Sequence, residues 1–362
     1  MKILQVINSM ATGGAEKLLL ETIPLYVERG IKMDILVLNE NNYPFMEKLK
    51  ALNICKVYSL GNGSVYNPLN IFKIIPYLRK YDIVHVHLFP SQYWVVLAKW
   101  FSFSKTKLVF TEHNTHNRRM ENSVFRFCDK IIYSGYKKVI CITQEVRDIL
   151  KQHLNAVDEK LIIIENGVNI ATIKNATIYQ KKDINSIAEE DKVLIQVAAF
   201  REQKDQQTLI KSMQFLPDSV KLLLVGDGPF KEACELLSTE LELENRVLFL
   251  GLRMDVPNLL KTADIIVLSS KYEGLSLSSI EGMAAGKPFV ASDVPGLTNI
   301  VKGAGVLFKQ GAAEELAQKI IELLENKNHY DTVAIACQNR AEQYDINVMI
   351  EKHVNLYTQI YK

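Results

Sequence analysis

The chain has 362 residues and a net charge of +2, and 48% of its residues are hydrophobic and 23% charged. This length suits two domains of about 150 residues each, and the composition excludes a disordered, collagen-like or disulfide-stapled chain. The five cysteines form no C-x-x-C pair and no apolar run is long enough to cross a membrane, so we expect a cytoplasmic protein without a zinc site.

Short β-rich runs alternate with stretches of helical spacing along the whole chain. In the first half, strands are predicted at Ile3–Ile7, Ile35–Leu38, Ile83–Val86, Leu108–Phe110, Val139–Ile142 and Leu161–Ile164. In the second half, they are predicted at Val193–Val197, Lys221–Val225, Val247–Leu250, Ile265–Leu268 and Phe289–Ala291. Such alternation predicts an α/β fold with parallel sheets covered by helices on both faces.

Two domains are expected because the strand series runs twice. The polar segment Ile170–Glu190 separates the two series. We therefore place a first Rossmann-like domain at 1–175 and a second at 176–340. A C-terminal helix is expected within 341–362, where Asn347–Ile360 has helical spacing.

The charge is unevenly distributed between the two halves. Lys and Arg outnumber Asp and Glu by eight in residues 1–174, whereas acidic residues outnumber basic ones by six in the remainder. A basic half can contact nucleic acid, an anionic membrane or an anionic substrate, or it can be an ordinary solvated surface. Nucleic acid is disfavoured because no recognised binding motif accompanies the charge.

Loops that follow strands are the places to look for a ligand, because ligands of open parallel sheets bind beyond the carboxyl ends of the strands. Gly13 and Gly14 follow the first predicted strand and allow an anion to approach the backbone closely. The motif G-x-G-x-x-G is missing, so a dinucleotide site is disfavoured, and a purely structural turn is the alternative.

The densest set of candidate residues follows the predicted strand Ile265–Leu268. Small residues leave the backbone N–H groups of 274–278 free, and the next helix adds the positive end of its dipole, so a phosphate would fit there. Glu273 and Glu281 could accept hydrogen bonds from sugar hydroxyls. The alternative for Glu281 is a capping box with Ser278, which needs no ligand.

Taken together, these motifs resemble glycosyltransferase family 4. The resemblance rests on Gly13–Glu16, Asn166–Val168, Gly226–Pro229, Pro295–Gly296, and Glu273 and Glu281 with seven residues between them. It covers nearly the whole chain and is most specific over Val193–Val301. It implies the GT-B fold, in which two Rossmann-like domains face each other across a cleft, and a C-terminal helix that packs back toward the first domain.

The resemblance also implies an activity. Family members transfer a sugar from a nucleotide-diphosphate sugar with retention of anomeric configuration. We expect a hexose-type sugar, a UDP-sugar donor, and a glycan or lipid-linked acceptor. We expect a role in polysaccharide biosynthesis because His85–Phe89 and Thr111–His116 look most like bacterial surface-polysaccharide enzymes. No Asp-x-Asp motif is present, so neither a metal nor a cofactor is expected. A nucleotide-sugar epimerase and a non-catalytic nucleotide-sugar-binding protein are the alternatives.

Individual roles follow from the matching positions. Glu273 and His113 would be the catalytic residues, with Glu273 on the donor sugar and His113 facing the transferred sugar. The donor-binding residues would be Gly13, Gly14, Arg201, Lys204, Gly274, Leu275, Ser276, Leu277 and Glu281. Glu281 would hold the ribose hydroxyls and Lys204 would neutralise the diphosphate. A buried core histidine is the alternative for His113.

One position departs from the family pattern. Many members have an arginine where this chain has Ala199. Either Arg201 supplies the missing cation, or the diphosphate has one contact fewer. Two further histidines, His85 and His87, alternate along a predicted strand, and we expect them to face opposite sides of the sheet and to form no metal site.

The resemblance implies that the first domain binds the acceptor and the second the nucleotide sugar, and one segment of the first domain suggests contact with a membrane. The segment Tyr93–Lys107 mixes aromatic and basic residues, as helices at a membrane interface do. Further basic residues are Arg118, Arg119, Arg126, Lys130, Lys137 and Lys138. We expect peripheral contact with the inner face of the cytoplasmic membrane, with an ordinary core helix as the alternative.

Overall fold

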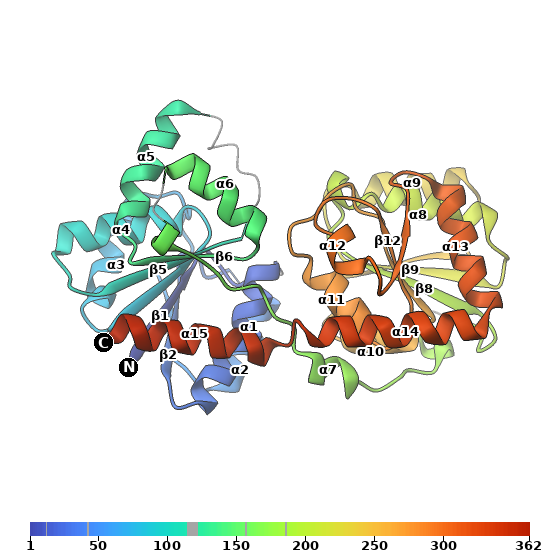
Figure 1. Ribbon diagram of the computed structural model, residues 1–362, viewed down its shortest axis with the longest axis horizontal. Coiled ribbons are helices and arrows are strands. Elements are labelled where there is room, and N and C mark those ends of the chain that lie inside the picture. Colours follow the sequence, from blue (N-terminus) through green and yellow to red (C-terminus); the bar gives the residue numbers. More distant parts are fainter. Residues whose placement is uncertain (12, 42, 114–121, 156–157, 185–186) are drawn as a thin grey trace. The chain divides into compact units, whose positions relative to one another are not determined.

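The computed structural model describes residues 1–11, 13–41, 43–113, 122–155, 158–184 and 187–362 (Figure 1). These residues form two compact units. The first consists of Met1–Gly167 together with Ile346–Lys362, and the second of Val168–Asp345. Each unit is an α/β domain built on its own parallel sheet, as the alternating pattern of the sequence predicts.

The first domain has a parallel sheet whose described strands run in the order β3-β2-β1-β4-β5-β6-β7. The strands are β1 (Lys2–Ile7), β2 (Lys32–Val37), β3 (Val57–Ser59), β4 (Ile83–His87), β5 (Lys107–Glu112), β6 (Lys138–Cys141) and β7 (Leu161–Ile163). The helices are α1 (Gly14–Glu28), α2 (Pro44–Leu52), α3 (Asn70–Leu78), α4 (Ser91–Ser102), α5 (Ser123–Ser134), α6 (Gln144–Leu154), the 3-10 helix η2 (Asp158–Lys160) and α15 (Ile346–Tyr361).

Helices cover both faces of this sheet. On one face, α1, α2 and α15 bury Ile3, Ile35, Ile83 and Val109 of the central strands. On the other face, α3, α4, α5 and α6 pack side by side (Figure 1). The central strands are rich in Ile, Val and Leu and almost fully buried, because a parallel sheet covered on both sides has no solvent face.

The second domain has a parallel sheet in the order β10-β9-β8-β11-β12-β13. The described strands are β8 (Lys192–Val197), β9 (Val220–Val225), β10 (Val247–Gly251), β11 (Ile265–Leu268), β12 (Phe289–Ser292) and β13 (Val306–Phe308). The α-helices are α7 (Ile170–Lys174), α8 (Gln206–Ser212), α9 (Lys231–Glu240), α10 (Val256–Thr262), α11 (Leu277–Ala284), α12 (Thr298–Val301), α13 (Ala313–Glu325) and α14 (Lys327–Glu342). The 3-10 helices are η3 (Lys181–Asp183), η4 (Glu202–Lys204) and η5 (Met213–Phe215).

The domain boundaries differ from those predicted. The first domain ends at Gly167 rather than at residue 175, because Ile170 and Ile173 of α7 are buried in the core of the second domain. The second domain extends to Asp345 rather than to residue 340, because α14 runs to Glu342 and packs against α11. The final helix α15 is counted with the first domain, where Tyr357 is fully buried.

Candidate functional site

The predicted site residues lie at the carboxyl ends of strands near the points where each sheet reverses its order. In the second sheet the order reverses between β8 and β11, and in the first between β1 and β4. Lys204 follows β8 and Glu273 follows β11, while Gly13 and Gly14 follow β1. Such switch points leave a crevice between diverging loops, which is where doubly wound folds bind ligands.

Lys204 and Glu273 form an ion pair in the second domain. The Nζ atom of Lys204 lies 2.6 Å from Oε1 of Glu273, and the hydroxyl of Ser270 donates to the same oxygen at 2.6 Å. Glu273 is only 7% exposed. Two donors on one oxygen hold the carboxylate in a single orientation. The described residues place no donor on its other oxygen, Oε2, which can therefore accept a hydrogen bond from a hydroxyl group.

The two loops that carry this pair are tied together. The backbone N–H of Lys271 donates to the carbonyl of Gln203 at 2.8 Å, and the Gln203 side chain donates to the carbonyl of Tyr272 at 2.8 Å. These bonds hold the loop after β8 against the loop after β11. The position of Lys204 relative to Glu273 is thus set by the backbone as well as by their mutual attraction.

A third loop, after β12, supports the backbone of Glu273. The N–H of Glu273 donates to the carbonyl of Pro295 at 3.1 Å. Gly296 has φ +83°, and a Cβ atom at this position would collide with the carbonyl of Glu273. Only glycine allows so close an approach in this backbone conformation, which explains the Pro295–Gly296 pair in physical terms.

Helix α11 begins directly after the Glu273 loop. Its N-cap is Ser276, whose hydroxyl accepts from the N–H of Ser279. The capping-box alternative for Glu281 is therefore wrong, because Ser278 lies inside the helix and Ser279 occupies the third helical position. Glu281 is buried on this helix. Within the described ranges, the N–H groups of 274–278 have no protein acceptor, so they and the positive end of α11 can meet an anion.

Arg201 is exposed and forms no ion pair with any described residue. Its backbone N–H donates to the carbonyl of Ala199 at 2.9 Å, and Ala199 is itself exposed. The described residues therefore place no partner on the guanidinium, unlike the ammonium of Lys204, which is held by Glu273.

The glycine pair of the first domain caps helix α1. Gly13 is the N-cap and has no side-chain cap, and the carboxylate of Glu16 folds over it so that a Cβ on Gly13 would collide with that side chain. Burial raises the pKa of Glu16, although a hydrogen bond from its own backbone N–H opposes the shift. The carboxylate of Glu16 therefore lies at the N-terminus of α1, where an anion that approaches Gly14 would also bind. The sequence motif alone did not indicate this position of Glu16.

His113 follows β5 and joins three other histidines of the first domain. Its Nε2 lies 3.1 Å from Nδ1 of His87, and the rings of His85 and His87 are 4.3 Å apart. The prediction that His85 and His87 face opposite sides is wrong, because residues two apart on a strand share a face. Among the described residues, no group of His, Cys, Asp or Glu side chains is arranged to hold a metal ion.

Burial lowers the pKa of every histidine in this cluster. The pKa of His113 falls to about 4 and that of His353 to about 3, and those of His85 and His87 lie well below the usual value. Neighbouring imidazoles add to the effect for His85, His87 and His353, since two positive rings would repel one another. The cluster is therefore uncharged at neutral pH.

The predicted membrane segment is only partly exposed. Most of α4 is packed into the domain, whereas Trp100, Phe101 and Phe103 at its end are exposed. Helix α5 has a second set of exposed apolar residues that the sequence analysis missed, Val124, Phe125, Phe127 and Ile131. Arg118 and Arg119 lie outside the described residues. No helix in the described part of the chain has the length and apolar character needed to cross a membrane.

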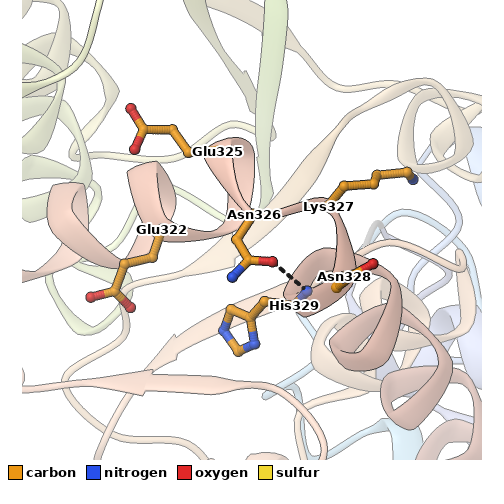
Figure 2. Close-up of a pocket in the computed structure, with 6 residues that line it drawn as sticks. All are labelled: Glu322, Glu325, Asn326, Lys327, Asn328 and His329. Carbon is orange, nitrogen blue, oxygen red and sulfur yellow. Dashed lines mark hydrogen bonds between the residues drawn. The ribbon is translucent and has the colours of Figure 1, made fainter.

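A surface pocket of about 590 Å³ lies at the junction of α13 and α14 in the second domain (Figure 2). Its lining residues are Glu322, Glu325, Asn326, Lys327, Asn328 and His329. The side chain of Asn326 accepts from the N–H of His329 at 3.0 Å and caps α14. None of the predicted site residues lines this pocket, so it is separate from the candidate site.

Both domains match models of glycosyltransferases. Residues 12–172 match the model described as Glycosyltransferase Family 4, and residues 178–340 match the model described as Glycosyl transferases group 1. The chain is a glycosyltransferase of these families. The two matches correspond closely to the two α/β domains, and they confirm the family suggested by the sequence motifs.

Several named glycosyltransferases and a related synthase are about 25–27% identical to this chain over most of its length. The N-acetyl-alpha-D-glucosaminyl L-malate synthase of Bacillus anthracis is 27% identical over 77% of this chain and 75% of its own. The N,N'-diacetylbacillosaminyl-diphospho-undecaprenol alpha-1,3-N-acetylgalactosaminyltransferase of Campylobacter jejuni is 25% identical over 88% of this chain and 89% of its own. A UDP-Gal:alpha-D-GlcNAc-diphosphoundecaprenol alpha-1,3-galactosyltransferase of Escherichia coli is 25% identical over 80% of this chain and 78% of its own.

Solved structures show the same fold. The HepE protein of Anabaena, in complex with UDP and glucose, has a TM-score of 0.87 at 23% identity and covers 99% of both chains. WaaG, a glycosyltransferase involved in lipopolysaccharide biosynthesis, has a TM-score of 0.74 at 17% identity and covers 98% of this chain and 99% of its own. These likenesses establish the GT-B fold for this chain.

Proposed function

We propose that this glycosyltransferase moves a hexose-type sugar from a UDP-sugar to a lipid-linked glycan acceptor, with retention of anomeric configuration and without a metal ion. The observation that carries the proposal is the buried Lys204–Glu273 pair beside the open N-terminus of α11. This arrangement places a cation, oriented N–H groups and a carboxylate oxygen next to one another. Those are the groups needed to hold a diphosphate and an attached sugar.

The reaction needs stabilisation of a leaving diphosphate as the bond to the sugar breaks. The ammonium of Lys204 and the N–H groups of 274–278 would supply it, because fixed dipoles and charges aimed at developing negative charge lower the barrier. In this scheme Oε2 of Glu273 accepts a sugar hydroxyl and Glu281 binds the ribose. From the first domain, His113 is proposed to face the transferred sugar, and Gly13 and Gly14 are proposed to bind the donor.

Retention is proposed to occur by front-face displacement. The acceptor hydroxyl would attack the anomeric carbon from the side on which the diphosphate departs, so the configuration is kept without a covalent intermediate. The departing diphosphate would take the proton from the acceptor. This route relies on the electrostatic groups described above and requires no nucleophilic side chain.

The choice of donor and acceptor is supported by the relatives. HepE of Anabaena has been solved with UDP and with UDP-glucose. The E. coli and C. jejuni relatives are named for acceptors carried on diphospho-undecaprenol. A lipid-linked acceptor would also explain why the first domain has exposed apolar residues and an excess of basic ones.

We further propose that helix α5 inserts into an anionic membrane surface. Val124, Phe127 and Ile131 recur at intervals of three and four residues and thus share one helix face, and the first two are 68% and 66% exposed. Arg126 and Lys130 on the same helix are exposed. An apolar helix face with basic neighbours is typical of interfacial helices.

Binding and product analysis test the proposed activity. UDP, GDP and ADP are each added to the protein, and UDP should raise the melting temperature of the second domain most. UDP-glucose is then incubated with and without a polyprenyl-diphosphate-linked sugar. A new glycolipid formed only with the acceptor is expected, whereas a changed nucleotide sugar in its absence would favour an epimerase and reject the proposal. Glu281→Gln should weaken UDP binding while the protein stays folded.

Vesicle binding tests the membrane proposal. The variant Phe127→Ser/Ile131→Ser should lose most of its affinity for vesicles that contain phosphatidylglycerol, and Arg126→Glu/Lys130→Glu should lose the salt-sensitive part. The control is Phe215→Ser, which removes an exposed aromatic ring from the second domain. If both α5 variants bind these vesicles as strongly as the Phe215→Ser control, a role for α5 in membrane binding is rejected. Lys107, the last residue of the predicted membrane segment, is left unchanged in these variants, because its ammonium donates to the carbonyls of Ile360 and Tyr361.

A further inference from the structure

We propose that Gln5 and His87 act as positioning residues that fix the tautomer of His113, so that its ring presents an unprotonated Nδ1 to the transferred sugar. The proposal rests on the proposed function for the contact between His113 and the sugar. The tautomer itself follows from a chain of hydrogen bonds that runs from the core of the sheet to the end of β5. Gln5 lies on β1 and His87 on β4.

The chain of hydrogen bonds begins at the side chain of Gln5, which is 1% exposed. Its amide nitrogen Nε2 lies 3.3 Å from the sulfur of Met33, which can only accept a hydrogen bond. The amide oxygen Oε1 therefore faces the other way, where it lies 2.9 Å from Nε2 of His87. An oxygen that can only accept requires the proton to be on that nitrogen of His87.

The next link runs from His87 to His113. With its proton on Nε2, neutral His87 has a lone pair on Nδ1 and can only accept there. Nε2 of His113 lies 3.1 Å from this atom and must therefore carry the proton that is donated. A neutral imidazole has one N–H group, so Nδ1 of His113 is left unprotonated. The described residues place no partner on that atom.

The groups around the hydrogen-bonded imidazoles keep them uncharged. The groups packed against His87 are the rings of His85 and His113, and His353 and Tyr357 of α15 lie next to His85. His85 is bonded to the hydroxyls of Tyr357 at 2.6 Å and Thr111 at 2.7 Å, and His353 to that of Tyr26 at 2.8 Å. No carboxylate of the described residues is hydrogen bonded to these imidazoles, so none stabilises a positive ring. Each link therefore has a single proton and a fixed direction.

The direction decides what His113 can do. An unprotonated Nδ1 accepts a hydrogen bond from a sugar hydroxyl, whereas a protonated Nδ1 would need a lone pair from the sugar. The residues that impose this choice do not touch the sugar. Their effect should therefore appear in the rate of transfer more than in the binding of UDP, which the second domain is proposed to hold.

Nitrogen NMR of the full-length protein with labelled histidine tests the tautomer directly. His113→Gln identifies the signal of His113, and His329→Gln, which changes an exposed histidine of α14, is the control. At neutral pH, His87 and His113 should both carry the proton on Nε2. A proton on Nδ1 of His113 would overturn the proposal, whatever the enzyme transfers.

The variant Gln5→Glu should reverse the direction of the hydrogen bond between His87 and His113 as the pH falls. At high pH the new carboxylate accepts from Nε2 of neutral His87, and the tautomers stay as in the wild type. When this pair takes up one further proton, the result is either a carboxylic acid that donates to Nε2 of His87 or an imidazolium, and His87 carries a proton on Nδ1 in both cases. Nε2 of His113 must then accept, and its Nδ1 becomes protonated. The tautomer of His113 should therefore change as the pH falls between about 8 and 5. The matched variant Gln5→Met has no such proton and should show no pH-dependent exchange. A His113 signal that stays constant in Gln5→Glu would overturn the proposal, and if that variant does not fold, the wild-type spectrum alone decides.

Kinetics separate this proposal from the proposed function. In Gln5→Glu, kcat should fall about tenfold on the acidic side of the tautomer change, while the affinity for UDP stays within about twofold of wild type. His87→Asn keeps an acceptor near the position of Nδ1 and should retain more activity than His87→Leu. If the tautomer changes and kcat does not, the hydrogen-bond chain is upheld and the proposed contact between His113 and the sugar is rejected.

Discussion

Replacing Lys204 with methionine tests the central ion pair of the second domain. The change keeps the length of the side chain and removes its charge, so Glu273 is left with Ser270 as its remaining donor. Removing one partner of a buried ion pair costs about 3–5 kcal/mol. The Lys204 side chain is 18% exposed and that of Glu273 6%, so water can partly solvate the carboxylate. We therefore expect a loss of about 2–3 kcal/mol in the free energy of unfolding.

The loss should be visible in the thermal transition of the second domain. For a domain of this size it corresponds to a decrease in melting temperature of roughly 5–10 °C. The double variant Lys204→Met/Glu273→Gln leaves no unpaired charge and should recover most of the stability. The matched control is Lys271→Met, whose ion pair with Glu202 is exposed, and which should lose less than about 1 kcal/mol.

Two results would refute this reasoning. One is a Lys204→Met protein as stable as the Lys271→Met control, and the other is a double variant no more stable than Lys204→Met. The affinity for UDP is measured on the same proteins by calorimetry. A charge-assisted hydrogen bond to the diphosphate is worth about 1.5–3 kcal/mol, so Lys204→Met should bind UDP about ten- to a hundredfold more weakly. An unchanged affinity would reject the proposed role of Lys204 in donor binding.

Three further outcomes are expected. If Arg201 replaces the cation missing at Ala199, Arg201→Ala should weaken UDP binding by about tenfold or more while uridine binding is unchanged; if it does not, Ala199→Arg should tighten UDP binding. Burial lowers the pKa of His113 to about 4 and that of His353 to about 3, so these histidines take up protons in the unfolded chain before they do so in the folded one as the pH falls below about 6.5. The free energy of unfolding should therefore decrease by up to about 1.4 kcal/mol per pH unit for each of these histidines. A melting temperature that is constant between pH 6.5 and about 4 would contradict this. EDTA should leave the initial rate of transfer unchanged, whereas a rate lost with EDTA and restored by magnesium or manganese would reject the proposed metal-independent reaction.

Local sequence patterns were enough to predict most strands and the loops that carry the donor site. The buried strands were found because they are short, largely apolar segments that end in glycine or polar residues. The edge strands β3 and β13, each of three residues, were missed, whereas the equally short edge strand β7 was predicted because it lies in a run of four apolar residues, Leu161–Ile164. The roles of Glu273, Glu281 and His113 came from the resemblance to a family and stay predictions.

Contacts between distant segments could be read only from the tertiary structure. Lys204 and Glu273 are 69 residues apart in the chain, and His85 and Tyr357 are 272 apart, so no local spacing indicates that either pair meets. The polar segment after Gly167 was read as a connection, yet two isoleucines of α7 within it are buried in the second core. The exposure of α5 depends on which of its faces α4 and α6 cover. Local propensity specifies which segments become helices or strands, whereas burial and hydrogen-bond partners are set by neighbours that only the folded chain brings together.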